Sequence, residues 1–520
     1  MWRTTFFNFS LKVFLAVAVM VVTENVLQAQ NPSVLQTVSP YSRYGIGDFQ
    51  FNGGLINTAL GGGGIALRND SMIPQYINLL NPASLTAHQL VTYEVSLMSN
   101  TVQLSNSSSS AIFNRTTLGH LALAFPVSKR WGAAFGLTPY SSVGYNVSSP
   151  DEVPNLGPVT YKYEGAGGVN QVFLANAIRP FAGATRKYLL SSNYDKDKLV
   201  GDTNVIKRKV RYRTALTNIS VGFTASYLYG SLTNIRRDVF PDSLQTFNTK
   251  IAKSTTFRDV YFNAGLQYTF RINRTINPQF QNMPDSLIVD KSWMKNKFVY
   301  RKGNQEETRN IFIKSPGARM TIGAVIGFPA EVATTYELLA QTYKQVGTIE
   351  QIRDTVSFVN GIPSRVQVPL MAGGGFAIKK DWKWMIQADY STQLWSGVAS
   401  TSAAGLVKNS HRATAGFQWQ PKIIGRGNYF AAVQYRLGMR YHQTALEINN
   451  VQLRETAINF SIGMPAPFRP RLSEPIGRLN MSFEVGRRGT IESGLLQENF
   501  FRVSIGMSIN DRWFTRYKID

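Results

Sequence analysis

The chain has 520 residues, of which 43% are hydrophobic and 12% aromatic, and it contains no cysteine. Its 55 lysines and arginines exceed its 31 aspartates and glutamates, which gives a formal net charge of +24. The lack of cysteine excludes disulfide scaffolds, thiol nucleophiles and thiolate zinc sites. The hydrophobic and aromatic content excludes a disordered chain, and the positive charge indicates either nucleic acid or an anionic membrane surface as a partner.

The first 29 residues have the pattern of an export signal. Arg3 and Lys12 precede the apolar run 13–22, and a polar stretch ending at Ala29 follows it. This run is too short to span a bilayer, and basic, apolar and small-residue regions in this order are typical of a cleaved signal peptide. We therefore expect residues 1–29 to be removed, a buried N-terminal helix being the alternative. Because an exported chain meets no cytosolic nucleic acid, we expect no nucleic acid partner.

Residues 30–90 show no regular alternation of apolar and polar residues. A glycine run with a following acidic residue, and then an Asn-Pro-Ala motif just before the first predicted strand, stand out: Gly61, Gly62, Gly63, Gly64, Asp70, Asn81, Pro82 and Ala83. Glycine allows tight backbone packing, Pro82 stops ladder pairing, and Asn81 can cap a turn. We expect this segment to pack inside the rest of the fold, because the run lacks the lysine of a phosphate loop.

From residue 91 onward, apolar residues alternate with small polar residues. No later segment approaches 18 consecutive apolar residues, which excludes a helical membrane protein. The clearest alternating segment, 429–441, is longer than most strands of soluble sandwiches, and its tilted rise of roughly 30 Å matches an outward apolar band. Thirteen segments share the pattern: 91–98, 117–125, 131–138, 219–227, 262–270, 319–328, 366–378, 383–394, 411–419, 429–441, 457–464, 479–485 and 501–509.

Two weaker candidates for strands are 159–175 and 331–343. Because single-chain bacterial barrels have even strand numbers, we predict about fourteen strands. The second face of these strands carries Gly, Ser, Thr, Asn and Gln, as expected for a narrow interior, rather than the long charged side chains of a soluble sandwich. The predicted fold is therefore an all-β transmembrane antiparallel barrel over residues 91–510, with 30–90 as a plug or hatch in the lumen and 511–520 as a charged tail. A soluble sandwich is the alternative.

Isolated charged residues fall on the predicted inward faces. They form a candidate charge ladder in the lumen: Glu94, Asp389, Arg436, Arg440, Glu484 and Arg502. Such a ladder is usually structural. The short connections 126–130 and 379–382 are predicted to face the periplasm, and the long charged connections 148–218, 229–259 and 271–310 the outside. Basic residues in the long connections are candidates for contact with lipopolysaccharide phosphates or a partner: Lys207, Arg208, Lys209, Lys295 and Lys297.

The four histidines do not suggest a catalytic site. His120 and His442 fall on polar strand faces and His411 begins a strand, so we interpret them as lumen or rim residues. No two histidines have the spacing of a metal site, and cysteine is absent. We therefore expect no catalytic residues, no metal and no cofactor, an outer-membrane hydrolase being a weaker alternative.

With this order of segments, the sequence resembles a divergent branch of the FadL/TodX family of outer-membrane transport barrels. The resemblance depends on the stretch from Gly61 to Asp70 and on Asn81-Pro82-Ala83, all ahead of about fourteen strands. In that family the N-terminal segment folds into the barrel, hydrophobic ligands enter from outside, and a gap in the wall can release them sideways. The resemblance implies a Gram-negative outer-membrane location and uptake of hydrophobic or amphipathic small molecules.

Three features depart from the family pattern: the start at 39–45, the basic connections, and the 510–514 ending with its charged tail. They resemble branches whose members work as accessory barrels beside protein-export or barrel-assembly machines. The alternative function is therefore a non-transporting barrel that docks to such a complex. The expected partners are outer-membrane lipid and lipopolysaccharide, with either a hydrophobic ligand or subunits of export or barrel-assembly machinery.

Overall fold

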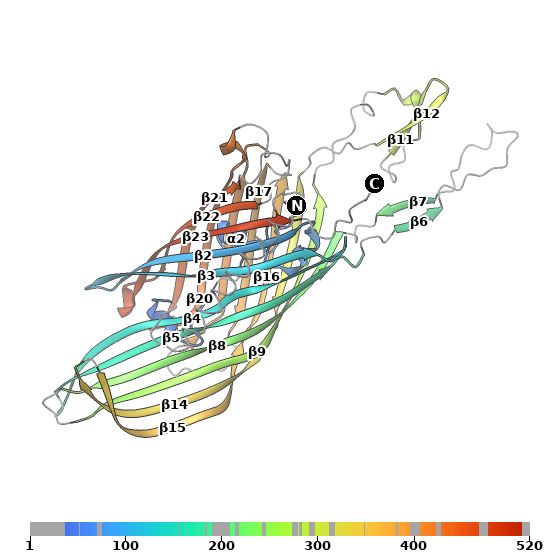
Figure 1. Ribbon diagram of the computed structural model, residues 1–520. Coiled ribbons are helices and arrows are strands. Elements are labelled where there is room, and N and C mark those ends of the chain that lie inside the picture. The colour runs from blue at the N-terminus through green and yellow to red at the C-terminus, as the bar shows by residue number, and fades with distance from the viewer. Residues whose placement is uncertain are drawn as a thin grey trace, which may run out of the picture.

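The computed structural model is an all-β protein in which one large antiparallel sheet closes into a barrel (Figure 1). It describes residues 37–50, 53–69, 75–154, 157–181, 185–189, 209–213, 218–241, 246–272, 279, 283–290, 297–310, 318–347, 349–380, 383–395, 406–422, 428–466 and 477–511. The predicted signal peptide and all of the predicted tail after Asp511 lie outside these residues. Within the described ranges, no helix is long and apolar enough to cross a membrane.

Fourteen strands form the barrel, which confirms the predicted fold class and strand number. Two of the fourteen are interrupted at Pro329 and Pro369, because proline cannot donate a ladder hydrogen bond. The pairing of β2 with β23, with Val95 opposite Met507, closes the barrel. The strands are β2 (Val91–Ser105), β3 (Ser110–Pro126), β4 (Trp131–Val153), β5 (Gly157–Ile178), β8 (Ile219–Val239), β9 (Asn248–Arg271), β13 (Arg319–Gly327) continued by β14 (Ala330–Val346), β15 (Ile349–Val368) continued by β16 (Leu370–Lys380), β17 (Trp384–Leu394), β19 (Ser410–Trp419), β20 (Gln434–Ile448), β21 (Val451–Pro465), β22 (Gly477–Gly489) and β23 (Gln497–Asp511).

Shorter elements lie in the N-terminal segment and in the connections. The N-terminal segment contains η1 (Pro40–Arg43), β1 (Asp48–Phe49), α2 (Leu55–Ala59) and η2 (Pro82–Ala87). The connections contain β6 (Thr185–Leu189), β7 (Lys209–Arg213), η5 (Asp285–Leu287), β10 (Ile288–Asp290), β11 (Lys297–Lys302), β12 (Gln305–Asn310), β18 (Leu406–Val407), η7 (Tyr429–Ala432) and η8 (Glu492–Gly494).

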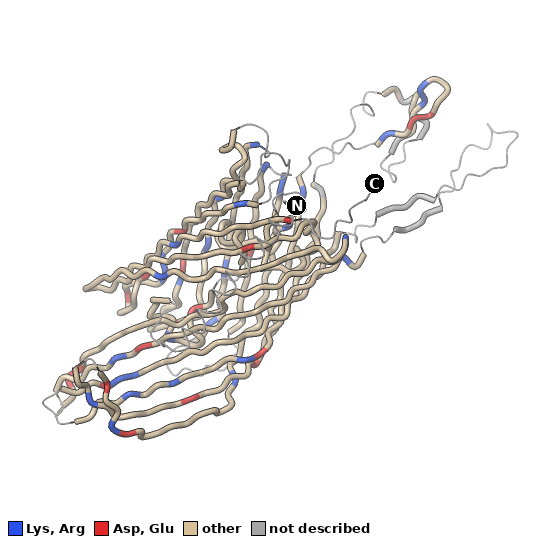
Figure 2. Tube along the Cα trace, in the orientation of Figure 1, with Lys and Arg blue, Asp and Glu red and all other residues tan. Residues whose placement is uncertain are grey.

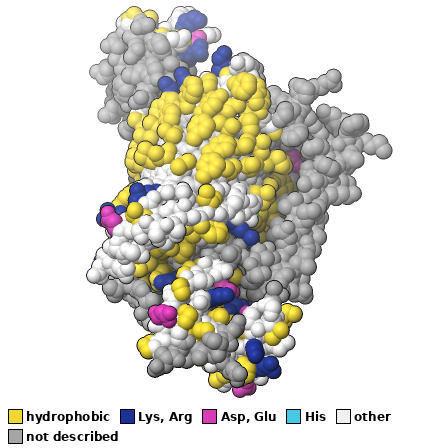
Figure 3. Space-filling view, turned by 90° about the vertical axis from the view of Figure 1, so that its left-hand side faces the viewer, with side chains coloured by type: hydrophobic (Ala, Val, Ile, Leu, Met, Phe, Trp, Pro, Cys, Tyr) yellow, Lys and Arg dark blue, Asp and Glu magenta, His cyan; other side chains and the backbone are white. Residues whose placement is uncertain are grey.

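The alternation in sequence corresponds to the two faces of the wall. In β8, Phe223 is 46% exposed on the outer face, whereas Ser220 is fully buried on the inner face. On the side of the molecule shown in Figure 3, hydrophobic side chains gather in one broad area. Small polar residues line the interior and apolar residues cover the exterior, as in transmembrane barrels.

The segment 429–441, predicted as one strand, is divided in the structure. Tyr429–Ala432 form the 3₁₀ turn η7, and β20 begins only at Gln434. The side chain of Asn428 accepts a hydrogen bond from the Ala431 N–H at 3.1 Å, which favours a turn over a strand at this point. The strand prediction is therefore wrong before Gln434. Within β20 the faces are as predicted, with Leu437 and Met439 exposed.

Strand direction defines the two ends of the barrel. We call the end where β2 begins and β23 finishes the terminal end, and the opposite end, with the turns 106–109 and 449–450, the distal end. Because strands alternate in direction, the strand ends that border the connections 127–130, 179–218 and 272–318 all lie at the terminal end. The prediction that short and long connections face opposite sides is wrong.

The same prediction is wrong about what its long connections contain. Residues 229–259 belong mostly to β8 and β9, and much of 148–218 belongs to β4 and β5. These stretches lie in six neighbouring strands, β4, β5, β8, β9, β14 and β15, which continue past the others at the distal end (Figure 1). Charged residues are spaced along these extensions (Figure 2). β4 and β9 have 23 and 24 residues, whereas β17 and β19 have 11 and 10.

Candidate functional site: the N-terminal segment in the barrel lumen

The N-terminal segment, residues 37–90, contacts the inner face of strands on several sides of the barrel. Two glycines on those strands allow close approach of the backbones. A side chain at Gly438 of β20 would collide with the backbone of Leu60 and Gly61, and one at Gly222 of β8 would collide with Pro82 and Ala83. The segment therefore contacts strands that are far apart around the wall.

The glycine run Gly61–Gly64 lies against β17, β19 and β20. The backbone N–H groups of Gly64 and Ile65 both donate to one oxygen, Oδ2, of Asp389, the latter at 3.2 Å. Successive N–H groups that converge on a carboxylate form a nest for negative charge. Gly61 and Gly62 have φ of +74° and +84°, a conformation that favours glycine. The run thus allows the backbone to bind a carboxylate of the wall.

The Asn-Pro-Ala motif forms the start of η2 at the base of the segment. The Asn81 side chain accepts from the Ala83 N–H at 3.0 Å, and its amide donates to the carbonyl oxygens of Ile65 at 2.8 Å and Leu266 at 3.2 Å. Asn81 thereby links η2, the end of the glycine run and strand β9. Asp70, the acidic residue of the first motif, lies outside the described residues.

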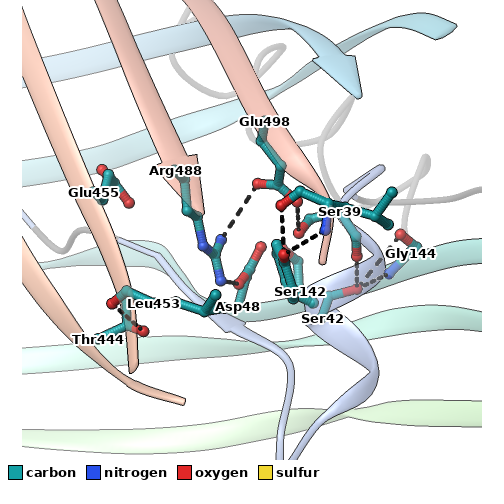
Figure 4. A network of polar contacts seen from close by, with 12 residues as sticks. Ser39, Ser42, Asp48, Ser142, Gly144, Thr444, Leu453, Glu455, Arg488 and Glu498 are labelled. Carbon is teal, nitrogen blue, oxygen red and sulfur yellow. Dashed lines mark hydrogen bonds and ion pairs between the residues drawn. The ribbon is translucent and has the colours of Figure 1, made fainter. Parts of the chain in front are cut away.

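A second set of contacts attaches the start of the segment to β22 and β23 near the distal end (Figure 4). Asp48 pairs with Arg488 at 2.7 Å, and Ser39 donates a hydrogen bond to Glu498. The Tyr41 hydroxyl accepts from the Leu496 N–H at 3.0 Å. Burial of this hydroxyl raises the pKa of Tyr41 to about 12, so it stays protonated. We call these residues the strap contacts.

The structure brings together three of the six residues of the candidate charge ladder. Glu484 pairs with Arg440 at 2.8 Å and with Arg502 at 2.7 Å. Arg440 also pairs with Glu455 at 2.6 Å, a contact that the sequence analysis missed. Arg488 was not predicted either, although it lies on the same inward face of β22 as Glu484 and Gly486.

The other three members lie apart from this cluster. Glu94 accepts from the Ile77 N–H at 3.1 Å and lies 3.2 Å from His120 Nε2. Asp389 binds the glycine run, and Arg436 donates to Gln418 and Asn480 at 2.9 Å each. The six residues therefore do not form one continuous ladder. Two of them, Glu94 and Asp389, bind the N-terminal segment instead.

The wall of the barrel is open between β3 and β4. The two strands pair only from Leu121 to Pro126 on β3 and from Gly132 to Leu137 on β4. Pro139, two residues beyond Leu137, lacks an N–H, and the pairing of β4 with β5 shifts register between Pro139 and Ser141. On β3, the register shift opposite Ser96 leaves Gly119 unpaired. We call this unpaired stretch the seam.

A cavity of about 1410 Å³ lies between the N-terminal segment and the wall, and it reaches the seam at Leu118 and Pro139. One side carries apolar side chains of β8 and β9, including Leu232, Phe257 and Tyr261. The other side carries the charged cluster around Glu484. The cavity is therefore not lined by apolar residues throughout.

The remaining predicted residues do not form a recognisable reactive site. Lys207, Arg208 and Lys295 lie outside the described residues, while Lys209 begins β7 and Lys297 begins β11. His88, at the end of η2, is buried, and in the described part of the chain neither of its ring nitrogens has a hydrogen-bond partner. Burial lowers the pKa of His88 to about 4. Within the described ranges, no group of three or more acidic or histidine side chains could hold a metal ion.

Solved structures with a similar fold include hydrocarbon transport barrels. The toluene transporter TodX of Pseudomonas putida is 13% identical, with 90% of this chain and 100% of that chain covered and a TM-score of 0.47. The toluene transporter TbuX of Ralstonia pickettii is 13% identical (89% and 100% covered, TM-score 0.46), and a Pseudomonas aeruginosa FadL homologue is 9% identical (89% and 100%, TM-score 0.47). These are barrels of the type that the sequence resembles, but at such scores the likeness says nothing about what this chain does.

A search of the curated proteins gives no match. The model of the BamG family matches residues 11–185 and 317–520, which is well over half of the chain. The unmatched residues 186–316 contain β6 except for its first residue, all of β7 to β12, and most of the two long connections. On the extent of this match, the chain belongs to the BamG family.

Proposed function

We propose that this protein is an accessory barrel of the outer membrane that docks to a barrel-assembly complex and does not serve as an open channel. The observation that carries the proposal is the attachment of the N-terminal segment to opposite sides of the wall. Asp389 of β17 accepts hydrogen bonds from the glycine run, and Arg488 of β22 pairs with Asp48. Asn81 joins the start of η2 to β9. A segment with this many buried polar contacts acts as a fixed plug, because each broken contact leaves a buried polar group unpaired.

The family name supports a link to barrel assembly. The match covers both the N-terminal segment and most strands of the wall, which together form the lumen contacts described above. A barrel whose interior is occupied by its own chain presents its outer wall and its connections to partners. This favours docking over conduction as the main role.

In the orientation we propose, the terminal end faces the periplasm, the outward apolar side chains contact membrane lipid, and the distal extension lies outside the cell. An exported chain reaches the membrane from the periplasm, so in this orientation neither its ends nor the connections 179–218 and 272–318 cross the bilayer. These two connections contain the basic residues Lys209 and Lys297. They would then face assembly subunits in the periplasm rather than lipopolysaccharide.

Depletion of the protein tests this function. We expect the folded, heat-modifiable fraction of several unrelated outer-membrane barrels to fall when the chain is depleted, and to recover when the full chain is supplied again. The matched control is depletion of an outer-membrane barrel of similar abundance. Unchanged levels of the other folded barrels would contradict the proposal.

A second candidate function is uptake of hydrophobic or amphipathic small molecules. The seam favours it, because the cavity beside the N-terminal segment is lined by Leu118 and Pro139, which border the unpaired stretch of the wall. For this function, a strain lacking the protein takes up radiolabelled toluene or a long-chain fatty acid more slowly than the parent strain. Equal uptake by the two strains removes this candidate.

A further inference from the structure

The edge of β4 that borders the seam has main-chain groups aimed away from β5. The Gly144 N–H donates to Ser42 Oγ at 3.0 Å across this edge, and the Tyr140 carbonyl accepts from the Gln50 N–H at 2.9 Å. Because alternate residues of a strand direct their N–H and C=O to the same side, Asn146 and Ser148 direct theirs to the seam as well. Among the residues that the structure describes, no strand pairs with them on this side.

The chain itself shows that this edge accepts a strand. β1 pairs antiparallel with β4, with Asp48 opposite Ser142 and Phe49 opposite Ser141. One step further along, the Ser42 hydroxyl takes the place of a main-chain partner by accepting from the Gly144 N–H at 3.0 Å. The hydroxyl itself donates to the Ser39 carbonyl oxygen at 2.7 Å and lies 3.4 Å from the Gly144 carbonyl oxygen. The chain's own segment therefore pairs with the edge up to Gly144, and among the described residues none pairs with the edge beyond Gly144.

The side chains around the open part suit a polypeptide better than a hydrocarbon. Asn146, Ser148 and Ser149 are exposed on β4. On β3, Asn114 and Thr116 are exposed as well, and their side chains donate to Thr101 and Ser99 of β2. Unpaired N–H and C=O groups need hydrogen-bond partners, which an acyl chain or an aromatic hydrocarbon cannot supply. A strand edge left open in this way is a template for pairing with another chain.

We propose that the β4 edge from Tyr145 to Pro150 binds an extended segment of a partner protein by antiparallel main-chain pairing that continues the ladder begun by β1. The occupant is a strand of polypeptide, selected by its backbone and by small or polar side chains that fit beside Asn146 and Ser148. This inference rests on the proposed docking function and names the surface through which docking takes place.

Site-specific photocrosslinking in native outer membranes tests the proposal. A photoreactive amino acid replaces Asn146 or Ser148, one at a time, in the full chain. The control position is Thr256 of β9, which is paired on both sides, with Ser231 and Thr335. Peptide mapping by mass spectrometry then locates each adduct.

We expect adducts from Asn146 and Ser148 to fall in one partner segment, two residues apart and in reverse order, with none of these adducts from Thr256. Adducts to lipid alone, adducts scattered over a partner without register, or the same adducts from Thr256 would each overturn the inference. If depletion still lowers the folded fraction of other barrels while no ordered adducts form, the docking surface is wrong and the proposed function stands.

A proline variant checks the role of the main chain. Ser148→Pro removes one N–H from the seam side and leaves the N–H groups of Val147 and Ser149, which face β5, in place. Loss of one such hydrogen bond weakens association with the partner by about fivefold. Ser148→Thr, which keeps the N–H, is the control, and both variants are first checked for heat-modifiable folding. Equal association of the two folded variants would contradict main-chain pairing.

Discussion

Asp48 and Arg488 form an ion pair at 2.7 Å although 440 residues separate them along the chain. The guanidinium of Arg488 also lies over the ring of Tyr41, 5.5 Å from its centroid. One arginine of the wall therefore contacts two residues of the N-terminal segment. Both members of the ion pair are largely buried, at 15% and 12% side-chain exposure. The pair therefore attaches the start of the N-terminal segment to β22.

Replacement of Asp48 by alanine is expected to detach the start of the N-terminal segment from β22. It leaves the Arg488 charge with less compensation in a buried site, which costs about 3 kcal/mol. Thermal unfolding in detergent, followed by the heat-modifiable gel shift, should occur at a lower temperature, and hydrogen exchange of residues 37–50 should be faster. Glu331→Ala, which breaks the exposed pair with Arg365, is the control and should change little. Equal effects of the two substitutions would contradict the assignment.

Gly438→Ala is expected to displace the glycine run from the wall. The added methyl group would overlap the backbone of Leu60 and Gly61, and overpacking of this kind costs about 1–3 kcal/mol. Protease cleavage within residues 53–69 should become faster in the folded barrel. Gly374→Ala on β16 is the matched control, because the nearest atom to its new methyl would be 3.7 Å away. Should both variants resist protease like the parent, the close approach at Gly438 is not a constraint.

His88 is expected to make the stability depend on pH. Its pKa is lowered by burial from 6.5 to about 4, so the folded state binds the proton less readily than the unfolded state. The contribution of neutral His88 to the free energy of unfolding is fully present above pH 6.5 and is lost as the pH falls from 6.5 to about 4. The loss is on the order of 3 kcal/mol at the lower pH. His88→Leu should match the parent at pH 7.5 and lose less stability than the parent by pH 4. Parallel pH profiles of the two proteins would contradict this.

The absence of cysteine allows a clean disulfide test of the seam. Phe49→Cys with Ser141→Cys places two thiols at a directly opposed pair of β1 and β4, which should form a disulfide readily. Thr117→Cys with Ser141→Cys joins positions that would be partners only if the ladder between β3 and β4 continued past Leu137. The first pair is expected to oxidise and the second to stay reduced. The reverse result would mean that β3, not β1, covers this part of β4.

Much of the barrel could be predicted because one physical constraint acts on every strand. Lipid outside and a narrow lumen inside impose period two, which identifies Phe223 as outward and Ser220 as inward without any structure. The constraint ends where the strands leave the apolar band. The extensions of β8 and β9 beyond Gly230 and Phe257 were interpreted as loops, because charged residues in them interrupt the alternation of apolar and small polar residues.

The contacts of the N-terminal segment could be anticipated only in part. Gly61–Gly64 and Asn81 were identifiable because glycine and asparagine have specific backbone and capping properties. Their partners were not, since Asp389 lies 325 residues from Gly64 and Leu266 lies 185 residues from Asn81, and no local pattern encodes such pairing. The seam has a local signal in Pro139, which cannot donate a hydrogen bond to a ladder.

The most direct test of the account is to lock the N-terminal segment to the wall with the Phe49→Cys/Ser141→Cys disulfide in cells that contain no other copy of the protein, and to measure the folded fraction of other outer-membrane barrels. A fixed plug in an accessory barrel predicts that locked cells match the parent, whereas depleted cells show a lower folded fraction. If locked cells show the same loss as depleted cells, the segment must move for function, and the account of a fixed plug is contradicted.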